Sequence, residues 1–127
     1  MKRWIFLVAM TLTAAGVYAN GGAVFVTNSS LVRWVASTDT VFSGIPPTVT
    51  ETRQTDELLG YLVAIADSAT GAGLTSIPSG TTARELYDVV RTYLGEHRVN
   101  PRASAVLPVL EALSAAFPAP AKIGPTQ

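Results

Sequence analysis

The sequence predicts an all-α fold, a small four-helix domain with long irregular connections, and three observations support this prediction. Two segments in the last third of the chain carry helix start signals followed by apolar residues at helical spacing. A third segment is apolar almost all round, as expected of a central helix. Glycine, proline and threonine are concentrated between these segments. We predict helices near residues 29–37, 55–70, 82–96 and 101–117.

The clearest helix start is Thr82-Ala83-Arg84-Glu85, which has the S/T-x-x-E pattern of a capping box. In this motif the hydroxyl and the carboxylate each accept a hydrogen bond from a free backbone N–H group at the helix start. Apolar side chains then recur every three or four residues. They are Leu86, Val89, Val90, Tyr93 and Leu94. The pattern predicts Thr82 as the N-cap of an amphipathic helix that Gly95 can end.

The helix near residues 101–117 is expected to start with Asn100 as N-cap and Pro101 at the first helical position. Its apolar stripe is Val106, Leu107, Leu110, Leu113 and Phe117. Pro118 stops it, and Pro108 conflicts with a helix interior. Either the helix is kinked at Pro108, or it begins at Ser104 and places this proline in the tolerant first turn. We expect one core formed by Leu62, Ile65, Leu86, Val90, Leu94, Leu110, Leu113 and Phe117.

The first half of the mature chain gives weaker signals. Ser29 or Ser30 can cap a short helix ending near residue 37, although its valine-rich sequence also suits a strand. Thr38 to Gln54 contains glycine, prolines and many threonines, and we interpret it as a long irregular connection. Thr55 then caps the apolar helix, with two acidic residues in its first turn. A second loop, residues 71–80, leads to the capping box.

The first nineteen residues have the pattern of a secretory signal peptide. Met1-Lys2-Arg3 is followed by an apolar run from Trp4 to Ala15 and by Val17-Tyr18-Ala19, a typical cleavage site. The run is short for a membrane span, and the chain has no cysteine that could carry a lipid anchor. We therefore predict cleavage after Ala19, a single domain over residues 20–127, and a periplasmic protein that is not membrane-bound.

The composition excludes several classes of function. Two of the nine basic residues lie in the leader, so residues 20–127 carry seven basic against nine acidic residues, a net charge of −2. Nucleic-acid binding is not expected from this balance. His97 is the only histidine, beside Glu96 at a helix end, and cysteine is absent, so no metal site, catalytic residue or cofactor is predicted. Asp67, at the end of an apolar helix, must be solvated or paired with an arginine.

In order and spacing, the segments resemble the Rap/Tai immunity proteins of type VI secretion over residues 29–119. The strongest matches are Val89-Val90-x-x-Tyr93-Leu94-x-x-His97 and Ala116-Phe117-Pro118, and Gly60-Tyr61 and Ile77-Pro78 precede them in the expected order. The resemblance implies a small periplasmic helical domain, often a homodimer, that fills the active-site groove of a peptidoglycan amidase toxin. One departure is the absence of the cysteines that members usually carry. Their positions are occupied by Leu58, Ser76 and Ala119.

The leading hypothesis is thus a periplasmic immunity protein that binds an amidase effector and is not an enzyme. A periplasmic chaperone of the acid-stress Hde type is the alternative, but such proteins respond to pH through many acids and this chain has few charges. An enzyme is a distant third. Protruding loops suit an inhibitor, so we expect contacts from residues 38–54 and 68–79. The predicted partner-binding residues are Asp67, Ser68, Thr70, Gly71, Gly73, Leu74 and Thr75.

Overall fold

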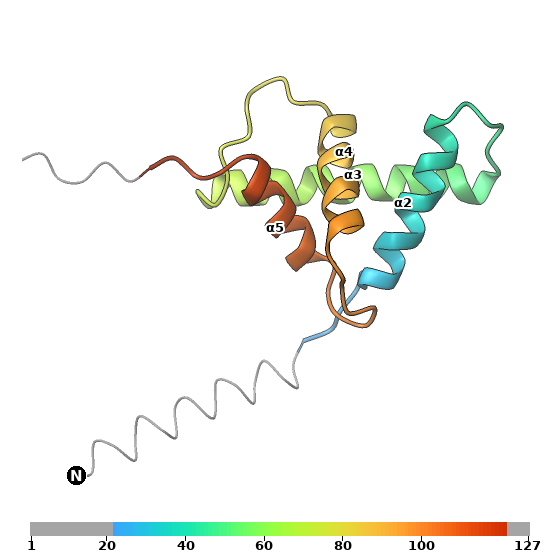
Figure 1. The fold of residues 1–127 in the computed structure, drawn as a ribbon, viewed down its shortest axis with the longest axis horizontal. Helices are drawn as coiled ribbons and strands as arrows, with labels where there is room; N and C mark the ends of the chain where they lie inside the picture. The colour runs from blue at the N-terminus through green and yellow to red at the C-terminus, as the bar shows by residue number, and fades with distance from the viewer. Residues whose placement is uncertain (1–21, 122–127) are drawn as a thin grey trace, which may run out of the picture.

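A computed structural model describes residues 22–121, and the predicted signal peptide at residues 1–19 lies outside them. Within the described residues the chain forms four helices and no strand, which confirms the all-α prediction. The helices are α2 (Asn28–Phe42), α3 (Val49–Gly71), α4 (Ala83–Glu96) and α5 (Val106–Ala116). Helix α3 is a long rod in Figure 1, and it contacts each of the other three helices. No helix in the described part is long and apolar enough to cross a membrane.

Helix α2 is longer than predicted. Its N-cap is Thr27, whose hydroxyl accepts a hydrogen bond from the backbone N–H of Ser30, and not Ser29 or Ser30. The predicted end near residue 37 is wrong, because the helix continues to Phe42. The polar residues that suggested a loop are accommodated inside the helix: the hydroxyl of buried Thr38 donates to the Trp34 carbonyl oxygen at 2.8 Å. Local side-chain bonding of this kind lets threonine sit within a helix.

The irregular connection predicted for residues 38–54 is also wrong. Helix α3 begins at Val49, and a capping box between Thr48 and Glu51 starts it. The Thr48 hydroxyl accepts from the Glu51 N–H at 3.1 Å, and the Glu51 carboxylate accepts from the Thr48 N–H at 3.1 Å. Thr55, the predicted cap, is instead buried in the helix and donates to the Glu51 carbonyl oxygen. Only residues 43–48 connect α2 to α3.

Helix α4 confirms the prediction for residues 82–96. The Thr82 hydroxyl accepts from the Glu85 N–H at 3.2 Å, and the Glu85 carboxylate accepts from the Thr82 N–H at 2.6 Å. Both halves of the capping box are thus present. His97 is the C-cap residue, with its N–H bonded to the Tyr93 carbonyl oxygen.

Helix α5 begins at Val106 and not at Pro101. Pro108 therefore lies in the first turn, where its missing N–H costs no helical hydrogen bond. Asn100 caps no helix; its side-chain oxygen accepts from the Arg102 N–H in a turn. The connection between α4 and α5 is tied to the start of α2 by backbone bonds, including Asn28 N–H to the Ala103 oxygen at 2.9 Å and Ala105 N–H to the Val26 oxygen at 2.9 Å.

The core lies where α3 meets the other helices, and Leu62, Ile65, Leu86, Val90 and Leu113 are buried in it as predicted. Leu94, Leu110 and Phe117 are only partly buried and pack against its edge. Two residues of the expected α5 stripe are wrong, because Val106 and Leu107 are exposed. Besides the predicted Leu113, the side chains that α5 buries are Pro108, Val109 and Ala112. The buried face of α5 is thus rotated from the predicted stripe, which leaves large apolar side chains on the surface.

Candidate protein-binding surface

The end of helix α3 is a closed turn that projects one apolar side chain. The Leu74 N–H donates to the Ala69 carbonyl oxygen at 2.9 Å, and the Gly73 N–H donates to that of Thr70 at 3.1 Å. This bond pair is the Schellman motif, and Gly73 has the positive φ of +73° that the motif requires. Leu74 follows with 53% of its surface exposed. The turn thus presents a leucine to solvent from a fixed backbone.

The loop that contains this turn, residues 72–82, is anchored to the chain just after α5. Thr75 pairs with Pro118 in an isolated antiparallel bridge, and the Ser76 N–H donates to the Phe117 carbonyl oxygen at 3.0 Å. Thr75 is 3% exposed, and its hydroxyl lies 3.2 Å from that of Thr70. The loop is therefore held at both its helix end and its middle, as a pre-organised binding element needs to be.

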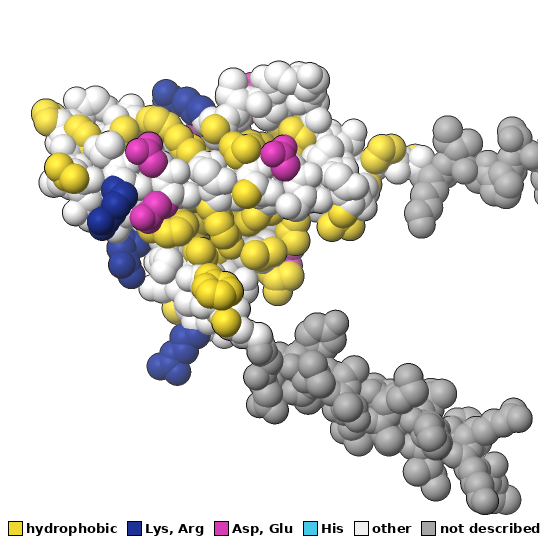
Figure 2. All heavy atoms as spheres, turned by 180° about the vertical axis from the view of Figure 1, so that it is seen from behind, with side chains coloured by type: hydrophobic (Ala, Val, Ile, Leu, Met, Phe, Trp, Pro, Cys, Tyr) yellow, Lys and Arg dark blue, Asp and Glu magenta, His cyan; other side chains and the backbone are white. Residues whose placement is uncertain are grey.

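A groove of about 420 Å³ lies between the C-terminal half of α3 and the first turns of α5, beside this loop. None of its lining residues is charged. The residues that shape it are Tyr61, Ala64, Ser68, Leu74, Val106 and Leu110. Leu107, which follows the lining residue Val106 on α5, does not line the groove and is 61% exposed. Figure 2 shows hydrophobic side chains gathered on this face, with few charged side chains among them.

Tyr61 supplies one of the few polar atoms in the groove. Its ring meets Trp34 edge to face, with the ring centroids 6.1 Å apart. Burial raises the pKa of the Tyr61 hydroxyl further above its ordinary value, because burial disfavours the charged phenolate. An exposed apolar surface with isolated hydroxyl groups is typical of a protein-binding site, where large side chains provide the affinity. This surface offers no acid, base or nucleophile arranged for catalysis.

The predicted partner-binding residues lie in one region of the structure, but not all of them are exposed. Asp67, Ser68, Thr70 and Gly71 are exposed and lie in the last turns of α3, not in a loop. Gly73 and Leu74 are exposed in the turn that follows, whereas Thr75 is buried and serves to hold the loop. The second expected contact region, residues 38–54, is helical except for the exposed connection at residues 43–48, so it is a short loop and not the long one expected.

The α5 side of the surface was missed from the sequence. Val106 and Leu107 have the same spacing signal as core residues, so periodicity alone assigned them to the interior. A signal that could have found them is the second apolar stripe formed by Pro108, Val109, Ala112 and Leu113, the residues that α5 buries. With 3.6 residues per turn, Leu107 lies on the other side of the helix from this stripe.

Two of the positions at which the resemblance expects cysteine have clear structural roles. Leu58 is fully buried in the core, so it fills space there with apolar contacts. Ser76 holds the 72–82 loop to the end of α5 through its backbone N–H. Main-chain bonding at this position thus constrains the loop without a disulfide.

His97 and Asp67 have the surroundings expected of surface residues. The His97 ring stacks on Tyr93 at the end of α4, with centroids 3.9 Å apart. Asp67 is exposed, and the ion pairs found among residues 22–121 join Arg53 to Glu57 and Arg91 to Asp39. No group of three or more metal-ligating side chains occurs among the described residues.

The fold is a small helical domain, and its exposed apolar surface has the chemistry of a protein-binding site. A family model of the Rap1a immunity proteins matches residues 44–119, which is more than half of the 127 residues. The chain therefore belongs to the Rap1a immunity protein family, whose members inhibit a cognate type VI secretion effector and are not enzymes. Comparison with curated proteins and with solved structures gives no significant match.

Proposed function

We propose that this protein protects the periplasm of its own cell by binding and blocking a peptidoglycan amidase delivered by type VI secretion. In this proposal residues 1–19 direct export and are removed, and residues 20–127 form the inhibitor. The observation that supports it most is the pairing of the anchored Leu74 turn with an uncharged apolar groove, in a member of an immunity protein family.

The two parts of this surface suit an inhibitor in different ways. The turn can enter a concave active site because it protrudes on a backbone that its hydrogen bonds already fix. The groove can receive side chains from the rim of that active site, because its walls expose Tyr61, Leu110 and Val106 without competing charges. Asp67, Ser68, Thr70 and Gly71 surround the turn and form the polar rim of the proposed contact.

The proposal is tested by producing, in the periplasm of a sensitive host, any peptidoglycan amidase that is encoded beside this gene. Full-length protein is expected to preserve growth. A variant lacking residues 2–19 is expected to give no protection, yet to bind the amidase when purified, because only its location has changed. If the leaderless variant protects as well as the full-length protein, the periplasmic proposal is wrong. If neither form binds the amidase, the proposed inhibitory function is wrong.

A further inference from the structure

A second groove lies on the opposite flank of α5, between α4 and α5, and its chemistry differs from that of the groove beside α3. Its volume is about 530 Å³, large enough for several side chains of a partner. On the α5 side it is lined by Ala112, Ala115 and Ala116, whose small side chains leave an apolar floor. On the α4 side, Asp88 and Glu96 line it.

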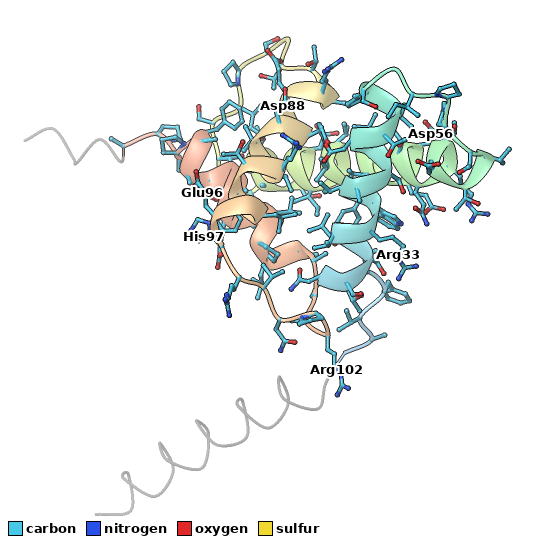
Figure 3. The ribbon with its side chains drawn as sticks, turned by 45° about the vertical axis from the view of Figure 1, so that its right-hand side comes forward. Arg33, Asp56, Asp88, Glu96, His97 and Arg102 are labelled. Carbon is cyan, nitrogen blue, oxygen red and sulfur yellow. The ribbon has the colours of Figure 1, made fainter. Side chains whose placement is uncertain are left out.

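The carboxylates of this groove form no ion pair within the described residues. Asp88 and Glu96 are both exposed. Arg84 and Arg91 line a neighbouring hollow with Asp88, and Arg91 pairs with Asp39 of α2 at 2.8 Å. No lysine or arginine lines the groove. Negative charge above a low-dielectric floor concentrates the local field, so the groove attracts positive charge. Figure 3 shows Asp88 and Glu96 on α4, with Glu96 beside His97 at the end of the helix.

The aromatic wall of the groove reinforces this preference. The Tyr93 ring stacks on His97. Its hydroxyl donates a hydrogen bond to the carboxylate of Glu111 on α5, which adds a third carboxylate next to the groove. That hydrogen bond raises the pKa of Tyr93, so the hydroxyl keeps its proton and directs it toward Glu111. The wall therefore offers mainly hydrogen-bond acceptors, as a guanidinium or an ammonium group requires.

Other occupants fit this groove less well. A second copy of the chain that met this groove with its own groove across a two-fold axis would bring the same carboxylates face to face, and a nucleic acid would be repelled by them. A bound metal ion would need a cluster of ligands that the described residues do not contain. A protein segment that carries positive charge and apolar side chains satisfies both the rim and the floor.

We infer that the α4–α5 groove receives a basic segment of the effector, with one arginine or lysine beside Asp88, another beside Glu96, and a small apolar side chain on the alanine floor. This inference rests on the proposed function. Asp88 and Glu96 are eight residues apart on one helix and are therefore separated by about 12 Å along its axis. An extended segment of about four residues spans that length. The effector thus contacts both flanks of α5.

The test measures affinity for the amidase encoded beside the gene, by calorimetry on the chain without residues 1–19. One variant is Asp88→Asn with Glu96→Gln, which removes the two charges and keeps the side-chain shape. The matched control is Asp56→Asn with Glu57→Gln, which makes the same change in net charge at exposed positions of α3 away from the groove, where Figure 3 places Asp56. A third variant, Ala115→Phe, fills the floor from an exposed position.

The groove variant is expected to raise the Kd by about tenfold or more at low salt, and the difference should shrink when salt screens the charges. Ala115→Phe should weaken binding at both salt concentrations, and the control should change the Kd by less than about twofold. Hydrogen exchange should show effector-dependent protection of residues 88–97. If the wild type binds but both groove variants bind equally well, the inference is overturned and the proposed function stands. If the wild type does not bind, both are overturned.

Discussion

The two flanks of helix α5 show how one short helix can present two different binding surfaces. Toward α3 it contributes the large side chains of Val106 and Leu110 to a groove lined by no charged residue. Toward α4 it contributes alanines to a groove with an acidic rim. Apolar burial dominates on the first flank and electrostatic complementarity on the second. The first is thus expected to set how tightly the effector is held, and the second how fast and how selectively it associates.

The largest expected effect comes from the core residue that both flanks share. Leu113 is fully buried, so Leu113→Ala should destabilise the domain by about 2–5 kcal/mol and impair both grooves together. Leu107→Ala, on the exposed surface of the same helix, should change stability by less than about 0.5 kcal/mol. Urea denaturation followed by circular dichroism measures both. Equal losses in the two variants would show that the buried face of α5 is misassigned.

The second-largest effect is a loss of affinity for the amidase, and its salt dependence should differ between the two flanks. Leu74→Asp combined with Leu107→Asp places charges on the uncharged surface and should cost about 2–4 kcal/mol of binding free energy to the amidase. Because both side chains are exposed, the melting temperature should stay nearly unchanged. The loss should persist at high salt, in contrast to that of the acidic-groove variant. A loss that salt relieves would mean that the two flanks do not differ in mechanism.

A smaller effect is expected from the two capping boxes, which lie at different distances from the grooves. Thr82→Ala and Thr48→Ala each remove one partner of a reciprocal pair and should each cost about 1 kcal/mol of stability. Only Thr82 begins a helix that lines the acidic groove, so only its replacement should increase hydrogen exchange near residue 88. Exchange data that show the same local opening in both variants would contradict this assignment.

The smallest effect concerns pH. Hydrogen bonds from the backbone N–H and the hydroxyl of Thr48 lower the pKa of Glu51 below its ordinary value. The stabilisation from the ionised carboxylate is therefore complete above the pKa of the unfolded chain and is lost as the pH falls through the lower folded-state pKa. Glu51→Gln keeps a capping side chain but removes this titration. The variant should lose less stability on acidification than the wild type, as thermal melts near pH 7 and pH 3 would show.

The sequence predicted the fold where local signals agreed with tertiary packing. The capping box at Thr82 was confirmed in detail because capping and apolar spacing gave the same helix start. The helix ends in the first half were wrong because threonine and proline were taken as loop signals. The box at Thr48-Val49-Thr50-Glu51 has the same pattern as the one at Thr82, but it lies inside the segment that was interpreted as irregular.

The candidate surface was predicted only in its α3 part. Leu74 and the exposed end of α3 follow from the turn chemistry around Gly73, which is local in sequence. The α5 part depends on how α5 is rotated against α3, and single-sequence periodicity does not determine that rotation once the helix start is misplaced. The acidic groove depends on Asp88 and Glu96 meeting alanines from another helix, a juxtaposition that only the folded chain creates.

The most direct test of the central claim is a titration of peptidoglycan cleavage by the amidase encoded beside this gene against the purified chain without residues 1–19. If the protein is an inhibitor that blocks the active site, cleavage should fall to background near one chain per amidase molecule. The Leu74→Asp, Leu107→Asp variant should need far more protein for the same effect. Cleavage that continues unchanged at a large excess of the wild-type chain would contradict the account.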